Sequence, residues 1–552
     1  MRASGECRSA VAVGRVVHAD LRHDHHVIDC IVVGAGHNGL VTAAYLARSG
    51  YSILVLEANS SVGGAAVSAE VFPGMGARVS KYSYLVSLLP PAIARDLAID
   101  VPLARRRVAS YTPDPADPRR ALVIPSNDEQ SLAANIENFT GSAKEAAAWQ
   151  RFYARTTAMA EVMFPSLTKP LVSREDMRAR IDAADWSDFV ERPLGEVLEH
   201  TFEEDVIRGL VFTDGLIGTF ADAHEDSLHQ NICFLYHVIG QGTGQWDVPV
   251  GGMGAITAQL ADRVRSAGGV VRTGVEVIAI EDDGEHVSVT TREGDDEVTY
   301  TARTLAANCA PGVLAKLRGL ETATISDRDG GAQVKVNMLL SRLPRLRDDS
   351  VDPADAFSGT FHVNESYRQL ESAHRTAASG QLPTPLPAEI YCHSLSDPSI
   401  LSKNLRAAGA HTLTLFGLHT PHSLFASNGT HQTRASGHGL DADDALAAVH
   451  ATLDSVLAEP VADCLMTDAE GNPCIEVNTT ADVERDLRIP TGNIFHTPLA
   501  WPWADDDQQI GTWGVETDSP RIVVCGSGAA RGGGVSGIPG HNAARHLTSV
   551  LG

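Results

Sequence analysis

The chain has 552 residues and carries 69 Asp and Glu against 44 Lys and Arg, a formal net charge of −25 at pH 7. Such a surface repels polyanions, which excludes nucleic acid as a partner and leaves at most peripheral contact with a membrane. The length predicts two or more domains with room for a large cofactor. No apolar run approaches the roughly 18 residues that span a bilayer, so we expect a soluble, cytoplasmic protein.

Residues 1–27 are expected to form a disordered extension. Four histidines crowd into its sequence HADLRHDHH, as in a metal-binding tract, but a mobile segment with freely titrating histidines is the favoured interpretation. Eight cysteines are scattered along the chain without a C-x-x-C pair. They signal neither zinc nor a disulfide framework and favour a reducing compartment, so no metal is predicted.

A strand, a turn and a helix are predicted in residues 27–50. The run VIDCIVVGAG is rich in β-branched and apolar residues, as expected of a buried parallel strand, and HNGLVTAAYLARSG has helical spacing. The glycines fit the G-x-G-x-x-G pattern of a dinucleotide site. Gly34 permits the tight turn, Gly36 allows the backbone to approach a pyrophosphate, and Gly39 allows helix and strand to pack closely.

The next predicted strand, SILVLEA, contains Glu57, twenty-one residues after Gly36. A carboxylate at this spacing can accept hydrogen bonds from ribose hydroxyls and would repel a 2′-phosphate. The sequence NSSVGGAA follows, and its Gly63, Gly64 and Ala65 predict a second close approach of backbone to cofactor. Dehydrogenases that bind only NAD do not need this second approach, so FAD is favoured.

Four segments carry a family resemblance: GAGHNGL, LEANSSVGGAA, PVGGMGAITAQLA and CGSGAARGGGVSGIPGHNAARHL. Together they resemble the phytoene-dehydrogenase-related flavoproteins, which include the pyridine nucleotide-disulfide oxidoreductase domain-containing protein 2 group, carotenoid desaturases, retinol saturases and, more distantly, amine oxidases. The resemblance runs from about residue 28 to the C-terminus. It implies an α/β fold in which a discontinuous, Rossmann-like FAD-binding domain is interrupted by an inserted α+β substrate domain.

On this resemblance the chain alternates between two domains. The FAD-binding domain is expected in residues 28–104, 246–329 and 486–552, and the substrate domain in residues 105–245 and 330–485. In the substrate domain, GSAKEAAAWQRFYARTTAMAEVMF predicts a helix, and QVKVNMLLSRLP and HTLTLFGLHTP predict strands. Their apolar faces are typical of a core and could also line an apolar tunnel.

The resemblance also implies further cofactor contacts. The backbone around Val277 is expected to hold the adenine. A strand in RIVVCGSG leads to a helix that begins near Gly537, whose positive end would face the flavin ring, where negative charge accumulates on reduction. Gly526, Gly534 and Val535 are the expected contacts at this end.

The thiol chemistry in the group's name is not expected here. A thiol-disulfide flavoenzyme needs two cysteines facing the flavin, but the cysteine after Cys30 is Cys233, far from the Gly63-Gly64 doublet. A second nucleotide motif is also missing, because Arg531 stands in GSGAAR where the third glycine would fall. We therefore expect neither disulfide reduction nor stable NAD(P) binding.

Two residues are candidates for catalysis. Lys335, in GGAQVKVNMLL, is similar to the amine oxidase lysine that holds a water at flavin N5 and assists oxygen reduction; the alternative is a strand lysine with its head in solvent. His496, in GNIFHTPLA, matches a family segment near the flavin. It could orient substrate or shuttle protons, and the alternative is a structural histidine.

Other segments are less specific. In AWPWADDDQQIGTWG, Trp501, Trp503 and Trp513 could form an aromatic wall and the aspartates could attract a cation, although a solvated loop is favoured for the acidic run. Arg531 departs from the proline usual in the relatives, which leaves the local flavin environment open. The histidine-rich residues 419–444 favour a flexible loop over a metal site.

Three functions are considered. The preferred one is an FAD-dependent enzyme that dehydrogenates or isomerises a hydrophobic substrate, such as a polyene, lipid or terpenoid, by hydride transfer to flavin N5. The second is an FAD-dependent amine oxidase that uses oxygen, and the third is a flavin-binding regulatory protein without catalysis. The expected partners are a hydrophobic small molecule and, as electron acceptor, oxygen or a quinone, with a homodimer as a candidate assembly.

Overall fold

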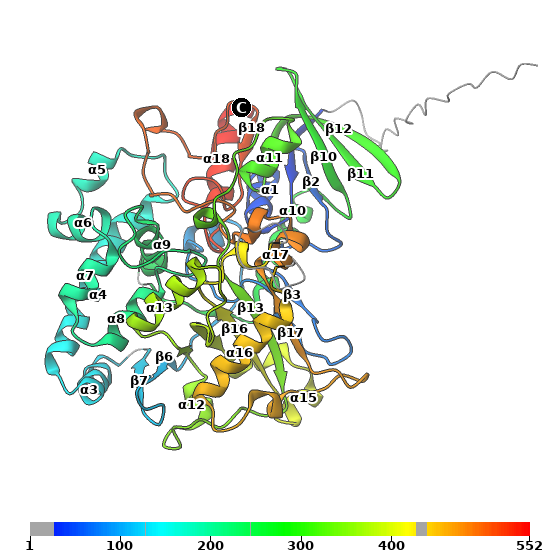
Figure 1. The fold of residues 1–552 in the computed structure, drawn as a ribbon. Coiled ribbons are helices and arrows are strands. Elements are labelled where there is room, and N and C mark those ends of the chain that lie inside the picture. Colours follow the sequence, from blue (N-terminus) through cyan, green and yellow to red (C-terminus); the bar gives the residue numbers. More distant parts are fainter. Residues whose placement is uncertain (1–26, 127, 243, 427–438) are drawn as a thin grey trace, which may run out of the picture.

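The computed structural model describes residues 27–126, 128–242, 244–426 and 439–552 (Figure 1). The predicted N-terminal extension, except for its last residue, lies outside this part of the chain, and so does the middle of the histidine-rich stretch. Two seven-stranded sheets organise the described residues. The first lies beside the C-terminal helix α18 (Ile538–Leu551), and the second lies at the opposite end of the molecule (Figure 1).

The first sheet has the order β10-β11-β12-β1-β2-β9, with β18 paired to β12. Its centre is parallel, because β1 pairs in parallel with β12 and β2, β9 with β2, and β18 with β12. The strands β10, β11 and β12 form an antiparallel meander. The bounds are β1 Ile28–Val33, β2 Ile53–Glu57, β9 Val270–Thr273, β10 Glu276–Asp282, β11 Val287–Glu293, β12 Asp296–Ala307 and β18 Ile522–Val524.

Both faces of this sheet are covered. The helices α1 (His37–Arg48), α10 (Met253–Ser266) and α18 pack on the face that carries Val32. The other face carries Ile31 and packs against the meander and α11 (Pro311–Leu317). Burial on both sides explains why β1 and β2 are continuous apolar runs and not alternating ones. The predicted strand, turn and helix at the start of the chain are therefore confirmed.

The second sheet has the order β17-β13-β16-β15-β14-β6-β7 and is antiparallel except for the pair β14 and β6. Side chains alternate between the faces of a strand. In β13, Val334 and Val336 pack into a core with α16 (Ala442–Val456), so Lys335 and Asn337 belong to the opposite face. The bounds are β6 Val108–Pro113, β7 Ala121–Pro125, β13 Val334–Leu340, β14 Thr360–Val363, β15 Ala388–Tyr391, β16 His411–Gly417 and β17 Ile475–Asn478.

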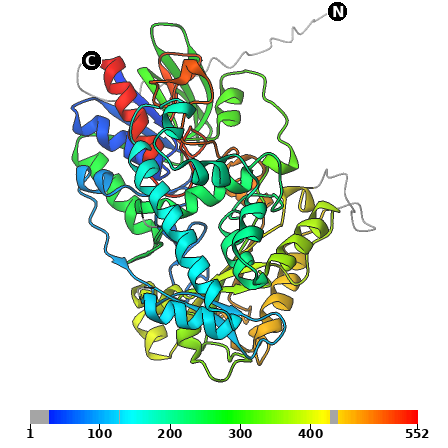
Figure 2. The same ribbon diagram turned by 90° about the vertical axis from the view of Figure 1, so that its left-hand side faces the viewer.

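A layer of helices stands beside both sheets and faces the viewer in Figure 2. Its core is aromatic, and Trp186, Phe152 and Phe202 are fully buried in it. The helices are α3 Glu129–Thr140, α4 Ala143–Met163, α5 Arg174–Arg178, α6 Ala183–Val190, α7 Leu194–Thr201, α8 Asp205–Thr213, α9 His229–Val238 and α13 Tyr367–Ala378. The long helix predicted in the substrate domain is α4.

Short elements connect these layers. Two small ladders pair β3 with β4 and β5 with β8. Their bounds and those of the short helices are β3 Ser68–Ala69, β4 Val79–Ser80, β5 Leu103–Ala104, β8 Val248–Pro249, α2 Pro91–Asp96, α12 Pro353–Ala356, α14 His393–Ser396, α15 Lys403–Ala407 and α17 Thr480–Leu487.

The chain enters each sheet several times. Strands of the first sheet come from residues 28–57, 270–307 and 522–524, and strands of the second come from residues 108–125, 334–417 and 475–478. This is a discontinuous Rossmann-like unit with an inserted α+β unit, so the predicted fold class is confirmed. The five boundaries between the predicted segments remain predictions.

Some features are absent from the described residues. None of their helices is both long and apolar enough to cross a membrane. The seven cysteines among them are all free thiols, and no three His, Cys, Asp or Glu side chains gather there as a metal would require.

Candidate functional site

A cavity of about 1770 Å³ lies between the two sheets and the helical layer. It exceeds the roughly 300–1,000 Å³ of ordinary small-molecule sites, so it has room for a dinucleotide and a substrate together. One end, here called the nucleotide end, is lined by Gly34, Gly36 and Glu57 at the carboxyl ends of β1 and β2. Open α/β sheets bind their ligands at this edge.

The glycine turn has little space for side chains. Gly34 has φ +94°, a conformation that favours glycine, and its N–H donates to the Leu56 carbonyl at 2.7 Å. A Cβ on Gly36 would stand 2.7 Å from Nδ2 of Asn308, and one on Gly39 would stand 2.3 Å from the Gly34 carbonyl oxygen. Gly34 and Gly36 therefore form the wall of the cavity, and Gly39 packs behind it.

Glu57 joins the turn to the second strand. Its side chain is 7% exposed; Oε2 accepts from the Ala35 N–H at 2.7 Å and Oε1 from the Asn59 N–H at 2.8 Å. A carboxylate can accept about four hydrogen bonds, so Glu57 can fix the turn and still accept from ribose hydroxyls. These residues fit a dinucleotide.

The second glycine pair packs against the first. The Gly63 N–H donates to the Ala35 carbonyl at 2.8 Å, and a Cβ on Gly64 would stand 3.3 Å from Cα of Gly36. Gly64 and Ala65 line the cavity, whereas Gly63 lies behind them. The predicted second approach of the backbone is thus made by Gly64 and Ala65.

The remaining expected contacts also divide into wall and support. Val277 of β10, Gly534 and Val535 line the cavity. Gly526 does not line the cavity. A Cβ there would stand 3.2 Å from the Asn308 backbone, so the missing side chain allows the two backbone segments to pack closely. The helix α18 begins three residues after Val535.

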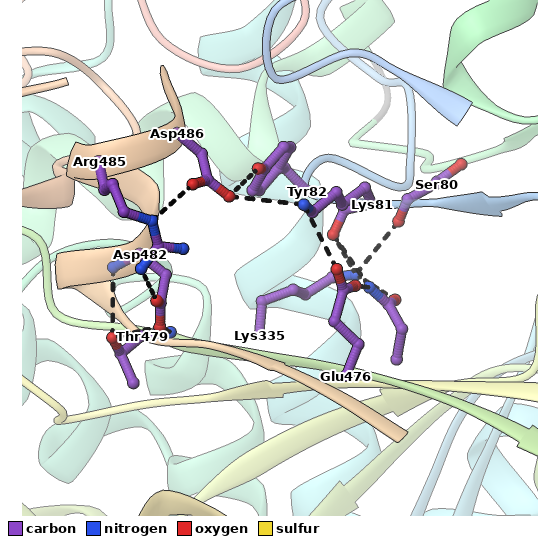
Figure 3. Close-up of polar contacts among 10 residues, drawn as sticks. Ser80, Lys81, Tyr82, Lys335, Glu476, Thr479, Asp482, Arg485 and Asp486 are labelled. Atoms are coloured by element: carbon purple, nitrogen blue, oxygen red, sulfur yellow. Dashed lines mark hydrogen bonds and ion pairs between the residues drawn. The ribbon is translucent and has the colours of Figure 1, made fainter. Parts of the chain in front are cut away.

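Lys335 also lines the cavity and is 3% exposed. Its Nζ donates to the Ser80 carbonyl at 3.3 Å (Figure 3). It also donates to Oδ1 of Asn337 at 3.0 Å and lies 4.9 Å from the centre of the Tyr84 ring. Burial lowers the pKa of Lys335 to about 7, although the negative charge of Glu476 opposes the shift. The alternative of a lysine with its head in solvent is therefore wrong.

A polar network holds Lys335 in place (Figure 3). Nδ2 of Asn337 donates to Oε2 of Glu476 at 3.0 Å and to the Lys81 carbonyl at 3.1 Å. Lys81 forms ion pairs with Glu476 at 3.3 Å and with Asp486 at 3.5 Å. Asn337 and Glu476 were not predicted from the sequence. For Asn337 the available signal was the alternation of β13, which puts it on the same face as Lys335.

His496 lines the cavity in a left-handed conformation, φ +69°. Its Nδ1 is buried without a hydrogen-bond partner among the described residues. Burial lowers the pKa of His496 to about 4. Burial also lowers the pKa of His37 to about 4, and repulsion between the protonated forms of His37 and His496 adds to this shift. Both imidazoles are therefore neutral at pH 7. His496 can donate or accept a hydrogen bond within the cavity.

A family model described as flavin containing amine oxidoreductase matches residues 39–381, more than half of the chain. The chain belongs to this family. It is an FAD-dependent oxidoreductase, which argues against a flavin-binding protein without catalysis.

Relatives of this flavoenzyme match along nearly the whole chain. An uncharacterised protein of Mycobacterium tuberculosis is 49% identical over 540 residues, 96% of this chain and 98% of its own. Mouse pyridine nucleotide-disulfide oxidoreductase domain-containing protein 2 is 28% identical over 576 residues, 94% of this chain and 92% of its own. The group named from the sequence is confirmed.

Solved structures share the fold. A triple mutant of putrescine oxidase matches with a TM-score of 0.56 at 15% identity, over 95% of this chain and 98% of that one. Cyclohexylamine oxidase from Brevibacterium oxydans matches with a TM-score of 0.52 at 15% identity, over 95% and 100%. At this identity they establish the architecture of the flavoenzyme alone.

Arg531 lies outside the flavoenzyme's cavity. Its guanidinium is buried and donates to the main-chain carbonyls of Trp513, at 2.5 Å, and of Ser166 and Lys169. Burial lowers the pKa of Arg531 to about 10, which leaves it charged at pH 7. This departure from the relatives therefore ties the helical layer to the C-terminal segment.

Trp501, Trp503 and Trp513 do not form the aromatic wall that the sequence suggested. Trp501 stacks on Trp503 at 4.9 Å, and Trp503 packs on Trp186 at 5.0 Å in the core of the helical layer. Trp513 lies 6.3 Å from His541, and none of these tryptophans lines the cavity. The aromatic lining comes from other side chains: Tyr82, Tyr84, Trp149, Tyr153, Tyr236, Trp246, Tyr391, Phe416 and Phe495.

Proposed function

We propose that this flavoenzyme dehydrogenates a largely apolar substrate that enters the cavity from the helical layer and presents a C–H bond near Lys335 and His496. When bound, FAD accepts a hydride from the substrate, and the substrate releases a proton. Oxygen or a quinone then takes up the two electrons. The observation that carries the proposal is the continuity of one cavity from the glycine turn to an apolar wall that includes Leu210, Ile217 and Val238.

The side chains of the chain have separate tasks in this proposal. The backbone of Gly36, Gly64 and Val277 would hold the dinucleotide, and the N-terminal end of α1 would stabilise the negative charge of its pyrophosphate. His496 is neutral and can orient the substrate or accept the released proton. The apolar wall excludes water from the reacting bond.

The test is anaerobic reduction of the bound flavin, followed as loss of its absorbance after mixing with candidate polyenes, lipids or terpenoids. Leu210→Glu places a charge in the apolar wall and should slow reduction about tenfold or more, with the FAD content unchanged. Leu103→Glu is the matched control, since Leu103 is 41% exposed. Equal rates in both variants would contradict an apolar substrate path.

Amine oxidation with oxygen is the second candidate, and Lys335 is the observation that favours it. A buried lysine beside the cavity with a pKa of about 7 exchanges its proton near neutral pH and can hold a water. Lys335→Met should slow reoxidation by oxygen about tenfold or more while substrate-dependent reduction stays near wild type. An unchanged rate would remove Lys335 from the reoxidation step.

A further inference from the structure

The second sheet carries a row of side chains into the cavity. Lys335 in β13 is paired with Phe416 in β16, Phe416 with Glu389 in β15, and Glu389 with His362 in β14. All four line the cavity, and Phe416 stands between Lys335 and Glu389 in the row. Neighbouring strands are about 4.8 Å apart, so Glu389 stands roughly 10 Å along the row from Lys335. We call the region around Glu389 the inner end of the cavity.

Two carboxylates at the inner end have oxygen atoms without a donor among the described residues. Glu389 is 6% exposed; Oε2 accepts from the Tyr391 hydroxyl at 2.5 Å, and Oε1 has no hydrogen-bond donor within the described residues. Asp214 also lines the cavity, and its carboxylate has neither a hydrogen bond nor an ion pair in that same part of the chain. A buried carboxylate without donors is costly, so this arrangement favours a ligand that supplies them.

The position of Asp214 adds to the cost. It directly follows the last residue of α8 (Asp205–Thr213) and caps the helix at its C-terminal end. The dipole of a helix places negative potential there, which disfavours a carboxylate and attracts a cation. Burial and, after it, the charge of Glu389 together raise the pKa of Asp214 to about 7. Asp214 is therefore unfavourable for folding where it stands.

The cations nearby do not neutralise the pair. His362 is engaged by Glu365, with Nδ1 2.6 Å from Oε2. Arg106 donates to Oγ1 of Thr360 at 2.5 Å and makes no ion pair within 4.0 Å among the described residues. When both are ionised, Asp214 and Glu389 give the inner end two negative charges against one uncommitted cation, Arg106. One further positive charge balances it.

Aromatic faces complete the environment. Tyr84 and Tyr391 lie 4.8 Å apart and both line the cavity, as do Trp149 and Tyr153 of α4. Aromatic rings stabilise a desolvated cation through their negative faces and pack well on an apolar chain.

We infer that the inner end binds a protonated amine of the substrate, held between Asp214 and Glu389, while the bond to be oxidised lies about 10 Å away beside Lys335. The substrate class is then an amphiphilic amine with an apolar body, whose charged group is remote from the reacting carbon. This inference rests on the proposed function, because it takes the Lys335 end as the reaction site. An uncharged polyene would leave the Asp214 carboxylate and Oε1 of Glu389 without donors from either the substrate or the described residues.

The experiment uses the FAD-loaded protein and three probes of equal chain length, octylamine, octanol and octanoate. Binding is measured by calorimetry and by the perturbation of flavin absorbance. Octylamine should bind about tenfold or more tightly than octanol, because charged hydrogen bonds replace neutral ones, and octanoate should bind more weakly than either. Octanoate binding as tightly as octylamine would assign the inner end to Arg106 and overturn the inference.

Two variants of equal shape test the carboxylates. Asp214→Asn and Glu389→Gln should each weaken octylamine binding about tenfold and leave octanol binding within about twofold of wild type. Glu321→Gln is the matched control, because Glu321 lines the cavity at the nucleotide end. Unchanged octylamine affinity in both variants would overturn the assignment.

Wild-type protein provides a test that does not depend on the folding of a variant. Burial raises the pKa of both Asp214 and Glu389 to about 7, so octylamine affinity should rise between pH 6 and pH 8 as they lose protons, while octanol affinity stays flat. A flat octylamine profile would contradict the inference. The titratable groups that face the pair are Tyr84, Arg106, Tyr153, Cys233, His362, Glu365 and Tyr391.

The two proposals fail separately. If octylamine binds as expected but no amphiphile bleaches the flavin, the proposed function fails and the cation site stands. If a neutral polyene bleaches the flavin with the same kcat/KM in wild type and in both carboxylate variants, the proposed function stands and the cation site fails.

Discussion

Glu57 and Asp214 are both carboxylates at the end of a regular element, but within the described part of the chain only Glu57 has donors. Glu57 closes β2 and accepts from two main-chain N–H groups, whereas Asp214 follows α8 and accepts from none among the described residues. The first carboxylate fixes a turn that exists before any ligand arrives. The second is left for a ligand to satisfy.

The same contrast holds for the surrounding walls. The nucleotide end is made of glycine backbone that packs closely, as where Gly64 meets Gly36. The inner end is made of charged and aromatic side chains supplied by α4, α8 and the second sheet. A family can therefore keep the first end for FAD while different members change the side chains at the second end for different substrates.

The largest expected effect comes from filling the bare backbone. Gly36→Val puts a side chain 2.7 Å from Nδ2 of Asn308 and into the space of the pyrophosphate. Overpacking of this kind costs about 1–3 kcal/mol, so the affinity for FAD should fall about tenfold or more. The measurement is flavin absorbance per mole of purified protein, with reconstitution by added FAD.

Gly268→Asn is the control for that change. Gly268 has a positive φ of +90°, a region that asparagine tolerates better than most residues, and no atom would lie within 4 Å of its Cβ. It should keep its flavin. Full flavin in Gly36→Val would break the comparison, because the nucleotide end would then not depend on bare backbone.

A smaller effect is expected from Glu476, which positions Lys335 through Asn337. Its negative charge raises the pKa of Lys335 against the effect of burial. Glu476→Gln removes that charge, so the pKa of Lys335 should fall below about 7 and the inflection of flavin reoxidation should move to lower pH. The measurement is the reoxidation rate between pH 5 and pH 9.

Two further variants separate position from charge. Lys335→Met should abolish the inflection, and Glu470→Gln, on the exposed turn before β17, should leave it in place. An inflection that survives Lys335→Met belongs to another group. In that case Lys335 supports the wall between Tyr84 and Asn337 and does not take part in reoxidation.

Sequence predicted the nucleotide end well because its parts are local. Gly34, Gly36 and Glu57 belong to one strand, turn, helix and strand, whose spacing is set by backbone geometry. The strand in RIVVCGSG and the helix near Gly537, which the family resemblance implied, are β18 and α18. Gly63 and Gly526 were predicted to contact the cofactor, but they do not line the cavity and pack against Ala66 and Asn308 behind its wall.

The inner end could not be predicted because its parts are distant in sequence. Asp214 lies in the helical layer and Glu389 in the second sheet, and only the pairing of β13, β16, β15 and β14 sets Glu389 in a row with Lys335. No local pattern encodes that register. The interpretation of Trp501, Trp503 and Trp513 as an aromatic wall was wrong for the opposite reason. They form a conspicuous local pattern, but tertiary packing places them away from the cavity.

The smallest effect on chemistry is expected from Trp503, which sharpens the contrast between core and wall. It is 3% exposed and packs between Trp501 and Trp186. Trp503→Leu should lower the free energy of unfolding by about 2 kcal/mol, because it leaves a cavity in the helical layer. Substrate-dependent flavin reduction should stay at the wild-type rate, as measured at a temperature where the variant is folded.

Trp246→Leu is the matched comparison, since Trp246 lines the cavity and stacks on His237 at 5.1 Å. It should change the rate of flavin reduction more than the stability, which reverses the pattern of Trp503→Leu. If both variants lose stability alone, the aromatic side chains of the cavity wall act as core, and recognition of the substrate rests on the charged groups of the inner end.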